Sequence, residues 1–339
     1  MYMIDEGVAS VCEMVMNGAG AFEQQMDKDD AANKFSHYLF HAEKVTLSAG
    51  IMLGREMIMS DRRIENEEAM LDEFFASALL YSLPQMYHNL DHLANTLCFG
   101  GFVLREIEKR DGTCIWQRVC FMISLCLHDI GHPGEPSRKE LGTVCDMYGC
   151  KKEAMSFEEI HASISHKVVD QYREELFGGM EGADADECIG LIRRLIFATD
   201  LRMNKEVIDE FDLKYIVDGE EGRARNAKSR EVGEIELKMM MKLADLSACY
   251  KEYEIFNKNS ELFWSEVWDV EGYARGLREI HEDIRLLERI SIPLIDSFSM
   301  VFEEFRMLYY RARQNLERHM KYYDELKRER KCYSDAGEY

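Results

Sequence analysis

Proline is scarce in this chain: 4 of its 339 residues are proline, where an average usage of about 5% would give roughly 17. Proline interrupts helices, so a chain that nearly lacks it can form long, continuous ones. Met, Leu, Glu and Arg, which all favour helices, are abundant. Strand-like alternation of apolar and polar residues is weak throughout. These features predict an all-α fold.

Several segments carry apolar residues at helical spacing. We expect helices over 69–83, ending at Pro84; over 87–104, with a break at Gly100 and Gly101; over 119–127; and over 297–331 as one long C-terminal helix. The run 119–127 would also suit a buried strand, but its helical neighbours favour a buried helix. Glycine clusters at 178–182 and 219–222 predict loops. No repeat or linker divides the chain, which indicates one domain.

The net charge is −22, and the sequence is 46% hydrophobic and 31% charged. An apolar content this high supports a buried core and excludes disorder for most of the chain. The negative charge argues against a nucleic-acid polymer or an anionic membrane as the main partner. It does not exclude a small anionic ligand, because a bound metal reverses the local field.

Nothing in the sequence indicates a targeting or membrane segment. The first residues include Asp5 and Glu6 and lack the basic region of a signal peptide. The longest apolar run, near 119–127, is too short to cross a bilayer. The 10 cysteines are scattered, and Cys145 and Cys150 are too loosely spaced for a zinc site, so reduced, buried thiols are expected. These observations predict a cytoplasmic protein.

Histidine and aspartate gather in two short motifs. His88 and His92 lie in YHNLDHLA, and on a helix residues four apart share one face. His128 and Asp129 lie in LHDIGHPG, directly after a buried apolar run. Imidazole nitrogens and carboxylate oxygens are preferred ligands of Zn²⁺, Mn²⁺ and iron, and carboxylates also bind Mg²⁺. A metal site of this HD type needs at least one further histidine and a distant aspartate.

Two aspartates in apolar segments are candidates for that distant ligand. Asp245 lies in MMMKLADLSACYK, and Asp200 lies in LIFATDLR. A buried carboxylate is costly unless it is paired or bound to a metal. A helix cap or a salt bridge is the commoner role for a single buried aspartate. The coincidence of two histidines, a His-Asp pair and an aspartate in an apolar helix nevertheless favours a metal site.

The motifs YHNLDH, LHDIGHPG, FATDL and LADLS resemble the successive signatures of class I cyclic-nucleotide phosphodiesterases, a branch of the HD superfamily of metallophosphohydrolases. The resemblance implies a compact all-α catalytic domain of about sixteen helices in three subdomains. The chain, 1–339, would be a single catalytic domain without a separate regulatory domain. Its parts would be an N-terminal helical subdomain at 1–68, a metal-binding core at 69–250, and C-terminal helices on the base side of the pocket at 251–339.

The resemblance also implies the metal chemistry. Four residues would hold a first metal, zinc: His92, His128, Asp129 and Asp245. Asp129 would bridge to a second metal, Mg²⁺ or Mn²⁺, and a water between the two metals would attack phosphorus as hydroxide. His88 would be the general acid that protonates the leaving ribose oxygen. The substrate would be a 3′,5′-cyclic nucleotide, cAMP or cGMP, and the product a 5′-nucleotide.

Further site positions follow from the same resemblance. Glu158 in SFEEIH would orient His88. It is preferred to Glu159 because it keeps a Glu-x-x-His spacing to His161. Tyr87 would line the pocket. Three residues would surround the metals, the first two by bonding metal-bound waters: His132, Thr199 and Asp200.

The base-recognition positions depart from the family. The glutamine that reads the purine edge falls, by its distance from Asp245, at Asp296. An ionised carboxylate only accepts hydrogen bonds, so Asp296 would favour guanine, with its adjacent N–H donors, over adenine. Phe298 or Phe302 would clamp the base, and Ala248 replaces a common asparagine. If the count slips, Asp296 is an ordinary helix-capping residue.

Two other functions stay open at this stage. One is another HD phosphohydrolase acting on a dNTP or a cyclic dinucleotide, since HDIGHP also occurs in that branch, although the YHNxxH pair is typically absent there. The other is a catalytically silent relative that binds nucleotides or a protein, which the full set of candidate ligands disfavours. Self-association as a homodimer through the C-terminal helix is an alternative to a simply solvated helix face.

Overall fold

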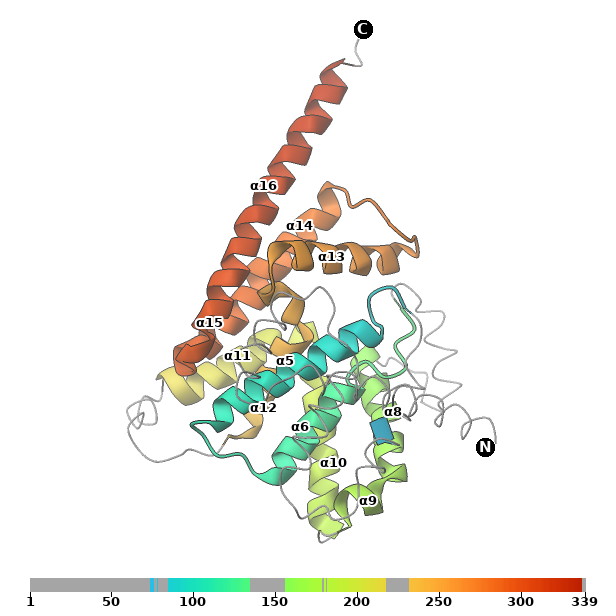
Figure 1. The fold of residues 1–339 in the computed structure, drawn as a ribbon, viewed down its shortest axis with the longest axis vertical. Helices are drawn as coiled ribbons and strands as arrows, with labels where there is room; N and C mark the ends of the chain where they lie inside the picture. The colour runs from blue at the N-terminus through green and yellow to red at the C-terminus, as the bar shows by residue number, and fades with distance from the viewer. Residues whose placement is uncertain are drawn as a thin grey trace, which may run out of the picture.

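The computed structural model of the chain describes residues 74, 75, 78, 85–134, 156–178, 180, 182–217 and 232–336 (Figure 1). These residues form helices joined by turns, with no strand among them. The all-α prediction is therefore confirmed. The expected number of about sixteen helices refers to the whole chain. The expected N-terminal subdomain, the 219–222 loop and the pair Cys145 and Cys150 lie outside the described residues.

The helices follow one another with short connections, some of them single 3₁₀ or π turns. In chain order they are α5 (Leu90–Glu108), α6 (Ile115–Leu127), α8 (Phe157–Gln171), α9 (Arg173–Phe177), α10 (Gly182–Phe197), η1 (Leu201–Met203), α11 (Asn204–Asp212), η2 (Leu213–Val217), α12 (Glu234–Asp245), η4 (Ser247–Tyr250), α13 (Tyr253–Trp268), α14 (Leu277–Leu286), η5 (Leu287–Ser291), α15 (Ile292–Val301), η6 (Glu303–Phe305) and α16 (Arg306–Ala336).

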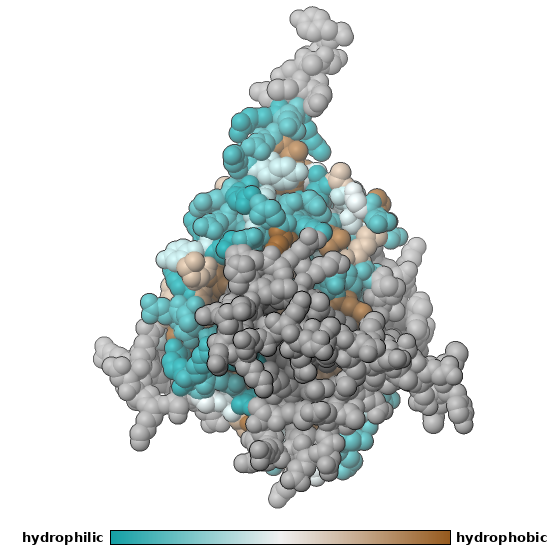
Figure 2. Space-filling model, viewed as in Figure 1, coloured by the Kyte–Doolittle hydropathy of each residue, from teal (hydrophilic) through white to brown (hydrophobic). Residues whose placement is uncertain are grey.

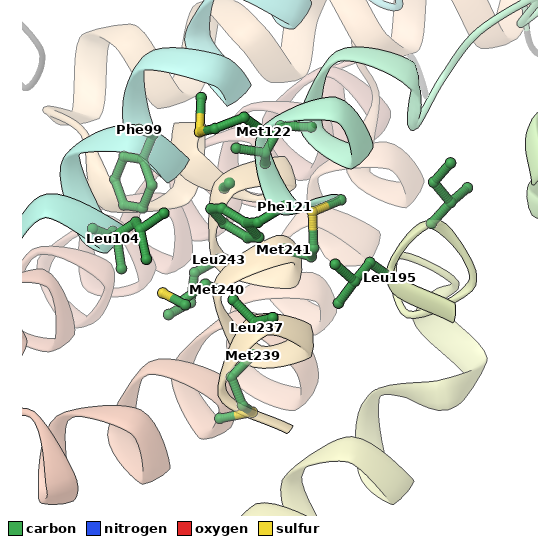
Figure 3. Packing of buried hydrophobic residues seen from close by; sticks show 14 of the residues in the cluster. Phe99, Leu104, Phe121, Met122, Leu195, Leu237, Met239, Met240, Met241 and Leu243 are labelled. Carbon is green, nitrogen blue, oxygen red and sulfur yellow. The ribbon is translucent and has the colours of Figure 1, made fainter. Parts of the chain in front are cut away.

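Helix α12 lies at the centre of the core. It packs against α5, α6, α10, α11 and α15, and its consecutive residues Met239, Met240 and Met241 are all fully buried. A helix that is apolar on every side is stable only when other helices surround it. Figure 3 shows these methionines along α12, with Met241 beside Phe121 of α6. The C-terminal end of α12, where Asp245 lies, is thereby held in a fixed position.

The predicted helix over 119–127 is confirmed as α6, whereas the predicted break in the preceding helix is wrong. Helix α5 runs through Gly100 and Gly101 without interruption. A Cβ atom on Gly100 would lie 2.4 Å from Cδ1 of Leu125. The glycine therefore serves the close approach of α5 and α6 rather than a turn. The helix also begins later than predicted, at Leu90, because Asn89 caps its first turn.

The predicted single helix over 297–331 is two helices, α15 and α16, separated at Phe302 and η6. Phe302 leaves the helical conformation with ψ of 78°, and its ring is buried against Phe298 and Phe211. The chain therefore changes direction between α15 and α16 at the residue whose ring is buried in the core. Helix α16 packs on α14 and α15 and then projects beyond the body of the molecule (Figure 1).

The surface near the projecting end of α16 is mostly hydrophilic (Figure 2). Within the described segments, no helix combines the length and the apolar character that crossing a membrane would require.

Candidate functional site

Three helix ends bring four predicted metal ligands together. His92 lies in the first turn of α5, His128 and Asp129 directly follow α6, and Asp245 is the last residue of α12. Nε2 of His92 lies 3.2 Å from Nε2 of His128, 3.2 Å from Oδ2 of Asp129 and 3.3 Å from Oδ1 of Asp245. Nε2 of His128 lies 3.0 Å and 3.6 Å from the same two oxygens. We call these four residues the metal-ligand cluster.

The spacing of the donor atoms fits a divalent cation. Ligand atoms about 2.0–2.2 Å from one ion, in tetrahedral or octahedral geometry, lie roughly 3.0–3.5 Å from each other. Oδ2 of Asp129 is buried and has no hydrogen-bond partner among the described atoms, although two imidazole nitrogens lie close to it. A cation bound at this point would replace the protons that the two imidazoles share with the carboxylates. The side chains present therefore suit a metal ion.

The local fold prepares His128 as a ligand. Apolar residues of α6 bury the imidazole completely. Its Nδ1 donates to the carbonyl oxygen of Leu125 at 2.9 Å. This bond directs Nε2 toward the cluster, so that loss of the Nε2 proton leaves a lone pair aimed at a bound cation, an arrangement common among metal-binding histidines.

The charges of the cluster also favour a cation. Burial alone would raise the pKa of Asp129, but the charge of His128 holds it well below its usual value. The pKa of Asp245 is lowered too, by hydrogen bonds to both histidines, against the effect of burial. Both carboxylates are therefore ionised at neutral pH. In return, and against the effect of burial, they raise the pKa of His92 and His128, so protonated rings balance the two negative charges when no metal is bound. A divalent cation that displaces these protons would take over that role.

A cavity of about 390 Å³ opens beside the metal-ligand cluster. Its walls come from the segment before α5, from α8, from the ends of α10 and α12, and from α13 and α14. The lining residues are Tyr87, His88, Asp129, His132, Phe157, Glu158, His161, Thr199, Leu201, Asp245, Leu246, Ala248, Cys249, Phe256, Asn259, Ser260, Phe263, Trp264, Glu282, Asp283 and Leu286. The volume suits a small organic ligand.

Glu266 of α13 holds His88, and the predicted contact from Glu158 is absent. Oε1 of Glu266 lies 2.5 Å from Nδ1 of His88, and Oε2 accepts the backbone N–H groups of Tyr87 and His88 at 2.7 Å and 3.0 Å. Burial alone would raise the pKa of Glu266, but the bond with His88 lowers it. Glu158 lies elsewhere in the cavity wall, 3.9 Å from the guanidinium of Arg202.

His88 does not share a helix with His92, contrary to the helical spacing. It lies in the bend before Asn89, and its ring stacks on His132 with centroids 3.8 Å apart. His132 in turn stacks on Phe157 at 5.0 Å. The imidazole of His88 is thus held on one side by a ring and at one nitrogen by a carboxylate.

His161 of α8 lies next to the cluster without hydrogen bonds. Both of its ring nitrogens are buried and unpartnered among the described atoms, and Nδ1 lies 3.7 Å from Oδ1 of Asp129. Burial lowers the pKa of His161 to about 4, so the ring is neutral at pH 7. An unpaired buried polar group is costly, and an ion with its water shell beside Asp129 would satisfy it.

The other predicted polar residues have different positions. Thr199 lies in the cavity wall and donates to the carbonyl of Ile196 at 2.8 Å. Asp200 is not among the cavity-lining residues: it caps η1 and pairs with Arg202 at 2.6 Å. Asp200 thus has the commoner capping role, and its grouping with the metal surroundings stays a prediction. Tyr87 lies in the wall, as expected.

The predicted base-reading residues Asp296 and Phe298 are not in the cavity wall. Oδ1 of Asp296 accepts from Nη1 of Arg306 at 2.7 Å on the molecular surface. Phe298 is fully buried in the core beside Phe302. The count from Asp245 places these residues on α15, one segment beyond α14, which supplies the wall.

Two acidic residues of the site were missed from the sequence, Glu266 and Asp283. Each lies in an amphipathic helix among other acids, SELFWSEVW in α13 and REIHEDIRL in α14. A solvated helix face is the ordinary reading of such a pattern. The one available signal is the aromatic neighbourhood of Glu266, between Trp264 and Trp268.

Comparisons with known proteins agree with this geometry. A sequence profile of the 3′5′-cyclic nucleotide phosphodiesterase family matches residues 87–279. The chain is also 26% identical, over 155 residues, to a Plasmodium falciparum protein named cGMP-specific 3′,5′-cyclic phosphodiesterase delta. That match covers 43% of this chain and 19% of the relative, so the chain spans about a fifth of the relative's length.

Two solved structures share the fold. The phosphodiesterase domain of the Salpingoeca rosetta rhodopsin phosphodiesterase matches with a TM-score of 0.69 and 13% identity, over 91% of this chain and 98% of that one. A structure of the phosphodiesterase domain of the same choanoflagellate's RhoPDE fusion protein matches with a TM-score of 0.66 and 13% identity, over 88% and 99%.

The matched range 87–279 is more than half of the chain. It includes the whole metal-ligand cluster, His88 and Glu266, and the helical fold agrees with it over most of the chain. The chain belongs to the 3′,5′-cyclic nucleotide phosphodiesterase family.

Proposed function

We propose that this protein hydrolyses 3′,5′-cyclic nucleotides to 5′-nucleotides with the help of divalent cations. The observation that carries the proposal is the joint position of the metal-ligand cluster and the Glu266–His88 pair on one cavity. Hydrolysis of a phosphodiester needs positive charge for the phosphate and a proton for the leaving oxygen. The metal-ligand cluster would supply the positive charge through bound cations, and the Glu266–His88 pair would supply the proton.

His92, His128, Asp129 and Asp245 would hold one cation, for which we propose zinc because imidazole supplies half of the ligands. The unpartnered ring of His161 beside Asp129 supports a second, more hydrated cation, for which we propose Mg²⁺ or Mn²⁺. Bound there, such cations neutralise phosphate charge and acidify water. Thr199 and His132 lie in the adjoining wall.

His88 would donate the proton to the leaving ribose oxygen. In the protonated ring, Nδ1–H donates to Glu266 and Nε2–H is available to the cavity, where His88 is a lining residue. Glu266 fixes the direction of the ring. Stacking on His132 restricts the ring further. An alkoxide is a poor leaving group, so a positioned acid accelerates its departure.

The test is a substrate panel. The purified protein with Zn²⁺, Mg²⁺ or Mn²⁺ is incubated with cyclic mononucleotides, cyclic dinucleotides and dNTPs, and products are identified by mass spectrometry. We expect 5′-mononucleotides from the cyclic mononucleotides. Turnover restricted to dNTPs or cyclic dinucleotides would overturn the proposal, and so would an inactive protein that retains its metals.

A further inference from the structure

The cavity lining contains two chemically different groups of residues. His88, Asp129 and Asp245 form the first, beside which a charged phosphate would lie. Helices α13 and α14 supply the other wall, including the apolar side chains of Phe256 and Leu286. A flat, largely apolar base fits this second wall. This placement of the substrate rests on the proposed function.

A buried carboxylate, Asp283 of α14, lies in the second wall, 4% exposed. Its Oδ1 accepts from Nε1 of Trp264 at 2.8 Å. Its Oδ2 accepts three hydrogen bonds: from Oγ of Ser260 at 2.5 Å, Nη1 of Arg275 at 2.9 Å and Nε2 of His319 at 3.2 Å. Oδ2 is therefore fully occupied, whereas Oδ1 keeps a lone pair with no second donor among the described residues.

The donors around Asp283 are all used within this network. Ser260 gives its only proton to Asp283 and accepts from Nη1 of Arg275 at 2.6 Å. Trp264 has a single N–H, which also points to Asp283. Nη2 of Arg275 donates to Oδ1 of Asn257 at 2.6 Å. What Asp283 and Ser260 together offer a ligand is therefore a pair of acceptors, Oδ1 of Asp283 and Oγ of Ser260.

Helix α16 fixes the carboxylate from behind. His319 is fully buried, with Nε2 facing Asp283 and Nδ1 lying 3.2 Å from the hydroxyl of Tyr253. In the neutral ring, Nε2–H donates to the carboxylate and Nδ1 accepts from the tyrosine. Burial alone would raise the pKa of Asp283, but the bonds from His319 and Ser260 lower it, so the group is an ionised acceptor at neutral pH. The wall is thus preorganised before a ligand arrives.

We propose that Asp283 and Ser260 select the base in this cavity and favour guanine over adenine. Guanine presents two donors side by side, N1–H and the 2-amino group, one for each acceptor of the wall. Adenine presents its amino group next to the bare N1 lone pair, which would face an acceptor. An unpaired buried polar group of this kind lowers kcat/KM roughly ten- to a hundred-fold.

The first test changes the ligand and leaves the protein intact. We expect kcat/KM to fall from cGMP to cIMP, which keeps N1–H and lacks the 2-amino group, and to be lowest for cAMP. Equal values for cGMP and cAMP would overturn the inference and leave the proposed function standing. If no cyclic nucleotide is hydrolysed, the proposed function fails, and the affinities for 5′-GMP and 5′-AMP still decide the base preference.

The second test changes the wall. Asp283→Asn replaces an acceptor by an amide donor, so the ratio of kcat/KM for cGMP to that for cAMP falls at least roughly tenfold. Asp296→Asn is the matched control, because it makes the same change outside the cavity, and it leaves the ratio unchanged. A folded Asp283→Asn protein with the wild-type ratio would overturn the inference. If Asp283→Asn does not fold, the cGMP and cIMP comparison decides alone.

Discussion

At the scale of single residues, His88 has one nitrogen committed and one available. Nδ1 pairs with Glu266, while Nε2 makes no hydrogen bond to the described residues. We expect His88→Ala to retain its metals and to slow hydrolysis of a cyclic nucleotide by about 10²–10⁴, the usual contribution of a positioned acid. A nitrophenyl phosphodiester, whose leaving group needs no proton, should be far less affected. Kinetics on both substrates check this, and equal losses on the two would contradict the role.

A substitution of Glu266 tests the orientation of His88 without changing any residue of the metal-ligand cluster. Glu266→Gln keeps the shape, and its amide oxygen can still accept the two backbone N–H groups, but its NH2 group then faces Nδ1 of His88 in place of the acceptor Oε1. We expect kcat to fall roughly 10- to 100-fold, as for other second-shell partners, with metal content unchanged. Glu158→Gln removes no contact to His88 and should cost less. A larger loss in Glu158→Gln than in Glu266→Gln would restore the original assignment.

At the scale of elements, the sequence best predicts features that depend only on neighbouring residues in the chain. Helix α6 follows from its apolar run, and the adjacency of His128 and Asp129 follows from the chain itself. The partner of His88 does not, because Glu266 reaches it across 178 residues through the packing of α13. Position 296 lies outside the cavity wall for a related reason. A count of residues from Asp245 does not show how many of them belong to each of the helices α13, α14 and α15.

The turn between η4 and α13 contains a buried lysine whose pKa can be tested. Lys251 is 1% exposed and donates to Oδ1 of Asn95. Burial lowers its pKa to about 8, whereas an unfolded lysine titrates near 10.4. Between these values the unfolded chain binds more protons, so this group makes the free energy of unfolding rise with pH, by up to about 1.4 kcal/mol per pH unit.

Lys251→Met removes this contribution. We expect the stability of the wild type relative to Lys251→Met to increase between pH 8 and pH 10, by roughly 2 kcal/mol. Urea denaturation at several pH values measures the difference. Lys205→Met, at a lysine that is 85% exposed, is the matched control and should show no such trend. If the difference in unfolding free energy between the wild type and Lys251→Met stays constant with pH, then burial does not lower the pKa of Lys251.

At the scale of the whole molecule, the metal-ligand cluster joins three helices that are distant in sequence. Its ligands come from the start of α5, the end of α6 and the end of α12, so a cation that binds them stabilises the folded state alone. At a concentration 100 times its Kd, such a cation adds about 2.7 kcal/mol to the free energy of unfolding. For a chain of this size, that corresponds to a rise in Tm of roughly 4 °C.

We therefore expect Zn²⁺ to raise the Tm of the chelator-treated protein, and we expect Asp245→Asn to abolish most of that rise. Replacing this carboxylate by an amide removes one of the two negative charges that balance the cation, while leaving the volume of the side chain unchanged. Asp296→Asn alters the same functional group away from the cluster and should keep the full response. Thermal denaturation of the three proteins with and without Zn²⁺ makes the comparison. A metal-induced shift of equal size in Asp245→Asn would show that the stabilising ion binds elsewhere.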